Sequence, residues 1–453
     1  MLDQLIKPEI QELIKNRKWK ELRDAVEEWP VPEIAELMMG LEKEDRVLFF
    51  RTLPRHLEAE VFYYLESEQQ NALLEELTDN ETKLLLSNLA PDDRAALINE
   101  LPAELTKQMM ALLDQKDLKE VRQLLGYPEE SVGRLMTPDY VAVNFEWTIK
   151  RALEHIRKTA KESETINVIY VTDKNEKLID VLDIRTFIVS DPEKKVQDIM
   201  DDTFVSISAY EDRETAVQMF QKYDKIALPV LDSEGVMLGI ITVDDVLDVA
   251  EEETTEDFHK GAAVAPLQVG YHGTSIWTLF SKRISWLIIL VGVNLVSSGV
   301  IEAFEDVLEA TIALAFFIPL LIDSGGNSGS QSATIMVRAI ATGDVKLREW
   351  MRTAGKEVLV GLTLGLAMGL ASWMLGIWRG GFEVGIVVGL AMICIVLVAN
   401  LIGTLLPFIL TRLNIDPAVA SSPLITTIVD ATGLLIYFSI AAAFLDPVVL
   451  DAS

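Results

Sequence analysis

Leucine recurs every 24 residues through the first third of the chain. Leu41, Leu65, Leu89 and Leu113 begin four such units, and a second leucine follows each of them 12 positions later. A turn residue comes directly after that second leucine in every unit: Pro54, Thr78, Pro102 and Gly126. Helical stretches between evenly spaced turns are typical of stacked helical repeats. The pattern predicts an α-helical solenoid, a kind of domain that usually serves as an interaction surface.

From about residue 133 the pattern changes to short apolar strands that alternate with helices. VAVNF and INVIYVTD are strand-like and the segment between them is helical, and the same order recurs in FVSIS, ETAVQMFQKYD, ALPVLD and GIITVDDVL. LMTP at 135–138 and DIM at 198–200 take corresponding positions in the two copies. This duplicated α/β unit resembles a pair of CBS domains, which are regulatory modules that often bind adenosine nucleotides.

The rest of the chain contains long apolar runs. A helix that spans a bilayer needs about 20 mostly apolar residues. A segment at 310–341 is interrupted midway by DSGGNSGSQS, where Pro319 and the pair Gly325 and Gly326 are expected to loosen the helix. Four further segments meet the length requirement directly: 284–301, 358–378, 384–411 and 424–445. The apolar half is therefore expected to be an all-α domain of five membrane-spanning helices.

Basic residues between these segments predict the orientation in the membrane. Cytoplasmic loops carry an excess of Lys and Arg. Arg379 is the single basic residue expected on the far side of the membrane. The other eight of the nine basic residues fall on the N-terminal side: Lys282, Arg283, Arg338, Lys346, Arg348, Arg352, Lys356 and Arg412. We expect a multi-pass protein of the plasma (inner) membrane with a cytosolic N-terminus and an extracellular or periplasmic C-terminus.

The net charge of -30 is concentrated in the first part of the chain. Residues 1–270 contain 57 acidic and 31 basic side chains, whereas residues 271–453 contain 13 and 9. Such an excess of acid disfavours nucleic acid as a partner, because phosphate binding needs clustered Lys and Arg. The single cysteine, Cys394, excludes a disulfide framework and a Cys-based zinc site.

Three polar residues inside the apolar spans are candidates for function. Asp323, Asn327 and Asp430 have no Lys, Arg or His beside them in the central part of any span. A carboxylate at membrane depth is costly unless it faces a partner or a water-filled path. The missing counter-charge is therefore expected to be a cation in transit. The competing interpretation is purely structural, with protonated or capping acids.

An acidic helix is expected between the α/β pair and the first span. In DDVLDVAEEETTEDFHKG, four acids fall on one helical face: Asp245, Asp248, Glu252 and Glu256. A run of like charges usually forms a solvated face. Its place between a regulatory module and a pore-like domain favours a functional role.

The whole chain resembles the MgtE magnesium channel family. The most specific motifs are PLLIDSGGNSGSQSATIMVRAIATGD in the second span and DPAVASSPLITTIVDATGLLIYFSIA in the fifth. The resemblance implies a homodimer that conducts Mg²⁺, with Asp430 holding the hydrated ion. It places Gly325, Gly326 and Asn327 against that ion, with Asp323 close by. Ser422 stands where many relatives have Asn.

The resemblance also implies ions between the cytosolic domains. The family places Mg²⁺ between solenoid, CBS pair and connecting helix, where it closes the channel. Nucleotide binding would use Tyr170 and Arg185, but Thr186 replaces the acid that would hold a ribose, so ATP stays a doubtful ligand. The matching regulatory positions are Asp93, Glu214, Asp224, Asp245, Asp248, Glu256 and Asp257.

The chemistry of the residues supports magnesium on separate grounds. Mg²⁺ prefers oxygen ligands and keeps several of its waters, whereas transition-metal transport would favour His or Cys. The four histidines, His56, His155, His259 and His272, all lie outside the expected spans. The chain also lacks the H-E-x-x-H helix of an intramembrane metalloprotease, so no enzyme activity is expected. The alternatives of a CBS-gated anion channel and a structural scaffold do not explain Asp430.

The expected organisation is a chain of five parts. They are an acidic solenoid at 1–130, a first CBS domain at 131–200, a second at 201–253, a connecting helix at 254–275 and a five-span pore domain at 276–453. The expected function is Mg²⁺ import closed by cytosolic Mg²⁺.

Overall fold

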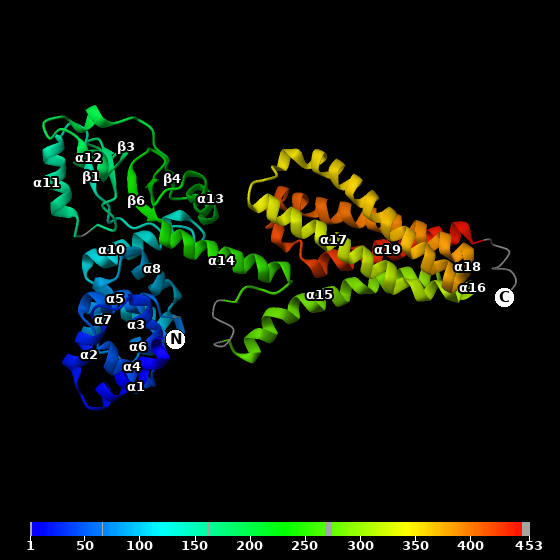
Figure 1. Cartoon of the computed structure of the whole chain (residues 1–453), viewed down its shortest axis with the longest axis horizontal. Coiled ribbons are helices and arrows are strands. Elements are labelled where there is room, and N and C mark those ends of the chain that lie inside the picture. The colour runs from blue at the N-terminus through cyan, green and yellow to red at the C-terminus, as the bar shows by residue number, and fades with distance from the viewer. Residues whose placement is uncertain (1, 66, 162, 268–273, 446–453) are drawn as a thin grey trace. The chain divides into compact units, whose positions relative to one another are not determined.

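The computed structural model describes residues 2–65, 67–161, 163–267 and 274–445. It divides into two compact units, Met1–Glu251 and Glu252–Ser453. The first unit begins with short helices, blue to cyan in Figure 1, and continues with two small sheets. The second unit consists mainly of long helices, green to red in the same view. Parts of the expected connecting helix and pore domain, at 268–273 and 446–453, lie outside the described residues, and the expected domain boundaries stay a prediction.

The first unit opens with the helical stack that the leucine repeat predicts. Leu41, Leu53, Leu65, Leu89 and Leu101 are all buried in one apolar core. Helices of 8 to 14 residues are marginal alone, so burial of these side chains stabilises the stack. The helices are α1 (Leu2–Lys15), α2 (Trp19–Val26), α3 (Val31–Met39), α4 (Lys43–Phe50), α5 (Arg55–Tyr63), α6 (Ser67–Leu74), α7 (Asp79–Asn88), α8 (Pro91–Glu100), α9 (Ala103–Leu112) and α10 (Gln115–Leu124).

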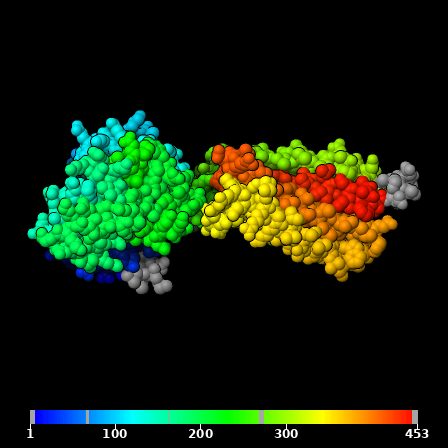
Figure 2. Space-filling model, turned by 90° about the horizontal axis from the view of Figure 1, so that it is seen from above, coloured from blue at the N-terminus to red at the C-terminus, as the bar shows by residue number. Residues whose placement is uncertain are grey.

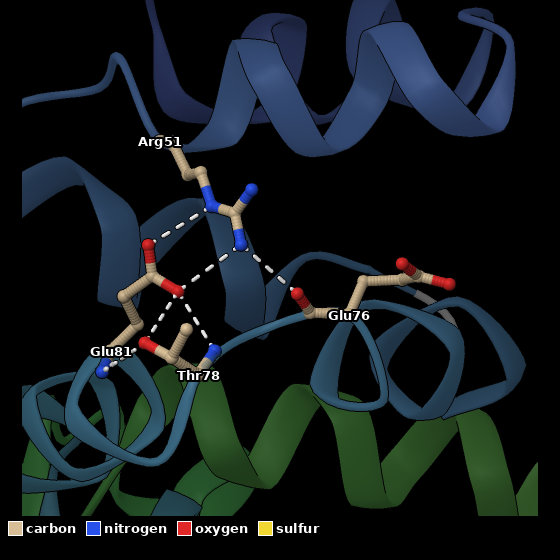
Figure 3. A network of polar contacts seen from close by, with 4 residues as sticks. All are labelled: Arg51, Glu76, Thr78 and Glu81. Carbon is tan, nitrogen blue, oxygen red and sulfur yellow. Dashed lines mark hydrogen bonds and ion pairs between the residues drawn. The ribbon is translucent and has the colours of Figure 1, made fainter.

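Polar contacts at helix ends join successive layers of the stack (Figure 3). Thr78 caps α7 in a capping box, in which its hydroxyl accepts from the Glu81 N–H and its own N–H donates to the Glu81 carboxylate at 2.8 Å. The same carboxylate accepts from Nε of Arg51, just after α4, at 3.0 Å. Arg51 also donates to the carbonyl of Glu76 at 3.0 Å. One arginine thus connects the end of α4 to the start of α7.

The two α/β copies follow with matching topology. Each has a three-stranded sheet in which the first two strands are parallel and the last two antiparallel, in the orders β1-β2-β3 and β4-β5-β6. The first copy contains η1 (Val132–Arg134), β1 (Ala142–Asn144), α11 (Ile149–Thr159), β2 (Val168–Thr172), β3 (Leu178–Asp183) and α12 (Ile184–Val189). The second contains η2 (Val196–Ile199), β4 (Ile207–Ser208), α13 (Arg213–Tyr223), β5 (Ala227–Leu231) and β6 (Met237–Thr242).

The acidic helix α14 begins directly after β6 and runs from Val243 to Gly261. Val246 and Val249 are buried, while most of the acids are exposed or half-buried. The last segment of the second CBS copy and the first part of the expected connecting helix, 254–261, are thus one continuous helix, whereas 262–267 are not helical. The first part of α14, to Glu251, belongs to the first compact unit and its last part, from Glu252, to the second.

The second unit contains four segments long and apolar enough to cross a membrane, counted over the described residues. They are Ile276–Ala303, Ile312–Ala341, Leu347–Arg412 and Ser422–Phe444. α15, light green in Figure 2, packs against α19. The elements are α15 (Ile276–Ala303), α16 (Glu305–Ala310), η3 (Ile312–Phe317), α17 (Ile318–Ala341), η4 (Leu347–Glu349), α18 (Trp350–Arg412), η5 (Pro417–Val419) and α19 (Ser422–Phe444).

The expectation that glycines would loosen the second span is wrong. α17 is an unbroken helix from Ile318 to Ala341. Pro319 lies in its first turn, where a missing N–H costs nothing. Gly325 and Gly326 allow close packing instead, because a Cβ at Gly325 would lie 2.5 Å from Ile395 and one at Gly326 would lie 3.0 Å from Thr426.

The 63-residue helix α18 is two helices joined at Gly381. Gly381 has φ 85° and ψ 178°, which only glycine adopts readily. The two halves pack against each other through small residues, since a Cβ at Gly376 would lie 2.6 Å from the Gly385 Cα and one at Gly369 would lie 2.9 Å from the Gly389 carbonyl oxygen. The halves therefore run antiparallel.

The capping box predicts a local stability effect. Thr78→Ala should destabilise the solenoid by about 1 kcal/mol, since the cap of α7 and a partner of Glu81 are both lost. Hydrogen exchange of α7 in the full-length protein measures this change. Ser87→Ala, which removes only an exposed hydroxyl bonded to the carbonyl of Leu84, should leave exchange nearly unchanged. Equal effects of the two substitutions would contradict the capping role.

Candidate functional site

A polar stripe runs along one face of α17 in the membrane unit. Asp323, Asn327, Gln331 and Thr334 are exposed in the single chain and recur at helical spacing. Ser330 belongs to the same stripe. Asn327, Ser330, Gln331, Thr334 and Ile335 line an open hollow of about 550 Å³. In an otherwise apolar unit, this face is built for water or an ion rather than for lipid.

α19 supplies a second polar row beside the first. Ser422, Thr426 and Asp430 lie four residues apart, and the hydroxyl of Ser422 donates to that of Ser330 at 3.0 Å. Asp430 is half-buried and lies close enough to Asp323 for the two carboxylates to repel each other. The structure therefore brings Asp323, Asn327 and Asp430 to one pair of adjacent helices.

Gly325 and Gly326 occupy a different environment from the polar stripe. Both glycines are buried. Gly325 packs against Ile395 and Val429, and Gly326 packs against Thr426. Their carbonyl oxygens belong to an intact helix. Packing explains both glycines, and their role as ion ligands stays a prediction.

A second acidic cluster lies in the first unit, where the start of α8 meets the start of α14. Burial, with the charges of Asp245 and Glu164, raises the pKa of Asp93 to about 7. Burial also raises the pKa of Asp245 to about 6, although a hydrogen bond from the hydroxyl of Thr242 at 2.6 Å opposes this shift. The hydroxyl of Tyr63, from α5, donates to Asp248 at 2.9 Å. Solenoid and α14 thus share one carboxylate cluster.

Sequence reasoning missed Asp92. Its side chain is buried, its Oδ1 has no hydrogen-bond partner among the described residues, and burial with the charges of Asp245 and Asp93 raises its pKa well above the ordinary value. Asp92 and Asp93 follow Pro91 directly, and only Asp93 was predicted from the sequence to be a site residue. Glu164, in the first α/β copy, was also missed, because nothing in its local sequence marks it.

Arg94 fixes the helix that carries these acids. It is 4% exposed, forms an ion pair with Asp117 of α10 at 2.9 Å and donates to the carbonyls of Leu86 and Leu89 at 2.8 and 2.9 Å. Among the described residues, the ion-pair partners of this guanidinium are Asp117 and, at 3.6 Å, Glu120. Arg94 therefore holds Asp92 and Asp93 in place without neutralising them.

The other expected regulatory acids are distributed over three places. Glu214 lies in the first turn of α13 and Asp224 caps its end in a left-handed conformation. They are about 15 Å apart along the helix, so they cannot bind one ion within a single chain. Glu256 pairs with Lys260 one turn later, and Lys260 also donates to Asp416 at 2.5 Å. Asp257 lies nearby, and burial with the charge of Asp416 raises its pKa.

Lys260 ties the end of α14 to the segment before α19. Its ammonium lies between Glu256 and Asp416, and these two partners raise its pKa. Asp416 also accepts from the N–H of Ala418 at 2.8 Å, which fixes its orientation. This contact lies within the second unit and attaches α14 to the segment that precedes α19, the helix that carries Asp430.

The two expected nucleotide residues are not brought together by any contact in the part of the chain described. Tyr170 is fully buried in β2, and its ring meets the edge of Tyr140 with centroids 5.8 Å apart. Arg185 is exposed in the first turn of α12. Tyr170 therefore has no exposed ring face on which a base could stack.

Among the described residues, no group of three or more His, Cys, Asp or Glu side chains already has the arrangement of a metal site. Mg²⁺ retains much of its hydration and needs only one or two direct carboxylates. Oxygen donors at the polar stripe and at the acidic cluster match this chemistry.

Family models match the helical stack, both α/β copies and most of the membrane unit. The MgtE family, described as a divalent cation transporter, matches residues 318–440. The MgtE intracellular N domain matches 29–130, and CBS domains match 132–190 and 196–252. The helical, tandem CBS and helical membrane architecture predicted from the sequence is thus confirmed.

Curated relatives match over nearly their whole length. The magnesium transporter MgtE of Thermus thermophilus is 40% identical over 97% of this chain and 98% of its own. That of Bacillus subtilis is 32% identical over 96% of both chains.

Two solved structures resemble the first unit. The soluble part of a magnesium transporter has a TM-score of 0.53 and 27% identity, over 55% of this chain and 99% of that one. The cytosolic domain of the Mg²⁺ channel MgtE in complex with ATP has a TM-score of 0.51 and 36% identity, over 54% and 99%. From these matches and its own fold, the chain belongs to the MgtE family of magnesium transporters.

Proposed function

We propose that this protein is a homodimeric, Mg²⁺-selective channel of the plasma membrane that imports magnesium and is closed by Mg²⁺ bound to its acidic cytosolic part. The observation that carries the proposal is the pair of polar rows on α17 and α19. Asn327 lines an open hollow, and Asp323 and Asp430 lie close to each other on the same two helices, in a unit made otherwise for lipid. A hydrated divalent cation supplies the charge that these acids lack.

The exposure of the stripe supports a dimer. A single chain would present Asp323, Asn327, Gln331 and Thr334 to hydrocarbon, which is costly for each side chain. A second copy that covers the same face would enclose the stripe and leave a water-filled path. Closed twofold assembly is the commonest way to bury such a face.

The break at Gly381 supports five membrane crossings. Each half of α18 has about 31 residues and is about 45 Å long, more than the hydrocarbon core of about 30 Å. With the other three segments, this gives the predicted number of spans. The basic residues Lys282, Arg338, Lys346 and Arg412 then lie on one side, which supports a cytosolic N-terminus and an external C-terminus.

The acidic cluster of the first unit supports closure by Mg²⁺. Asp92, Asp93 and Asp245 come together in a buried place, and burial, with the charges of neighbouring acids, raises the pKa of each carboxylate. A divalent cation converts the repulsion into attraction and favours the packed arrangement of solenoid and α14. Because α14 continues to Lys260 and Asp416, a change at its start can reach the segment before α19. An ATP site at Tyr170 is a weaker part of the proposal.

Substitution of Asp430 tests whether this residue binds the permeating ion. Asp430→Ala should lower Mg²⁺ uptake into proteoliposomes by roughly tenfold or more, equivalent to at least about 1.4 kcal/mol of lost stabilisation of the permeating ion. Asp430→Asn should be milder, since an oxygen ligand remains while the charge is lost. Glu305→Ala removes an exposed acid of α16 and serves as the control. Uptake by Asp430→Ala at the control rate would rule out the assignment.

Paired substitution in the acidic cluster tests closure. Millimolar Mg²⁺ should slow hydrogen exchange at 91–100 and 243–251 and reduce channel activity in the wild type. Asp92→Asn with Asp245→Asn should raise the Mg²⁺ concentration needed for both effects by about tenfold, because both carboxylates are lost. Asp24→Asn, an exposed solenoid acid, is the matched control. If the double variant closes at the wild-type Mg²⁺ concentration, the feedback proposal fails.

The same cluster predicts a pH dependence in the absence of divalent ions. The pKa of Asp93 is about 7 and that of Asp245 about 6 in the packed state, above their ordinary value of 3.8. The packed state therefore binds more protons, and its stability should fall as the pH rises from about 4 to about 7. Hydrogen exchange of α8, corrected for intrinsic rates, should speed up over that range. Asp93→Asn should flatten the dependence, and protection that instead increases with pH would contradict the assignment.

A further inference from the structure

A buried hydrogen bond joins α17 to the second half of α18 behind the polar stripe. The hydroxyl of Ser328 donates to Oδ1 of Asn400 at 2.5 Å. Ser328 is 6% exposed and Asn400 is 1% exposed, so neither reaches lipid or water. Nδ2 of Asn400 has no hydrogen-bond partner among the described residues. A leucine would fill this space without burying an unpaired N–H group, so packing alone does not account for the amide.

The helices touch backbone to backbone beside this bond. A Cβ at Gly403 would lie 2.1 Å from the carbonyl oxygen of Gly329, and one at Gly329 would lie 3.1 Å from that of Ala399. On the other side of Asn400, a Cβ at Gly361 would lie 3.3 Å from Nδ2. Surfaces of small residues permit close approach but are smooth, so they do not by themselves fix how one helix is rotated against another.

Ser328 is directly adjacent to Asn327, the residue that lines the hollow. Successive residues of an α-helix are turned by about 100°, so the two side chains point to different sides of α17. Ser328 points into the helix contact, and Asn327 points to the open hollow. Rotating α17 by one residue would turn Asn327 away from the hollow and into the helix contact.

We propose that Asn400 is a positioning residue that fixes the rotation and height of α17, and thereby the direction of Asn327 and Asp323. The hydrogen bond is the directional contact between two otherwise smooth surfaces. Asn400 does not touch the ion path and acts through Ser328. This inference rests on the proposed pore and adds a residue on the opposite side of the pore helix.

A thiol reporter tests the position of α17 without measuring ion flux. Asn327→Cys is introduced into a Cys394→Ser background, since Cys394 is the only cysteine of the chain. In the reconstituted full-length protein, a charged methanethiosulfonate reagent should modify this cysteine readily. Adding Asn400→Ala should slow modification about three- to tenfold, as expected when one buried interhelical hydrogen bond in a membrane bundle is lost. Ser328→Ala should slow modification to the same extent. The double variant, Ser328→Ala with Asn400→Ala, should be modified no more slowly than either single variant, because both substitutions remove the same hydrogen bond.

Thr404 offers a matched control. It is fully buried one turn after Asn400, and its hydroxyl has no partner among the described residues. Thr404→Val keeps the shape and should leave the modification rate and Mg²⁺ uptake at the level of the unsubstituted background. In a protein with the native Asn327, Asn400→Ala should raise the Mg²⁺ concentration for half-maximal uptake and weaken selectivity against larger divalent ions. A general loss of stability would lower the maximal rate without changing selectivity.

The outcomes separate this inference from the pore proposal. If Asn400→Ala leaves the reporter rate within twofold of the background, the positioning role is wrong. If Asn400→Ala does not assemble, Ser328→Ala removes the same hydrogen bond with a smaller change in volume, and its modification rate then tests the positioning role. If the reporter slows while Asp430→Ala transports normally, the positioning role holds and the pore assignment fails.

Discussion

This structure depends on one constraint: several carboxylates are held close together without an equal number of positively charged groups beside them. In the membrane unit, Asp323 and Asp430 lie together on α17 and α19. In the first unit, Asp92, Asp93 and Asp245 meet where α8 approaches α14. Each arrangement is unfavourable by itself, and in the proposed function a divalent cation offsets the repulsion. The fold supplies rigid helices that keep these acids from moving apart.

The partners of two basic side chains, the buried Arg94 and the half-buried Lys260, show which acidic residues have a structural role. Arg94 pairs with Asp117 and leaves Asp92 and Asp93 unneutralised. Lys260 pairs with Glu256 and Asp416 and attaches α14 within the second unit. Acids with such partners hold helices in place, whereas acids without them are available to an ion. This distinction depends on three-dimensional contacts, since both kinds of acid occur in the same acidic stretches of sequence.

Much of the fold was predictable because it follows from local periodicity. The leucine repeat gave the solenoid, the duplicated strand pattern gave the two sheets, and the apolar runs gave the membrane helices. Asp430 could be singled out because an acid in an apolar run is conspicuous in any context. Asp92 and Asn400 could not be chosen in this way, because burial and an unpartnered atom become visible only when α8 meets α14 and α17 meets α18. The straight course of α17 was missed because glycine was taken as a helix breaker, although tight packing against Ile395 and Thr426 overrides that tendency.

The reversal at Gly381 has a consequence for the surface of the membrane unit. A single residue with φ 85° turns the chain between two long helices, so there is almost no loop at that end. A toxin, an antibody or a protease would find little backbone to bind at this turn. In the proposed orientation the turn lies on the face presented to the environment, so the longer connection between α15 and α17, which contains α16 and its exposed Glu305, is the part of that face open to such a partner.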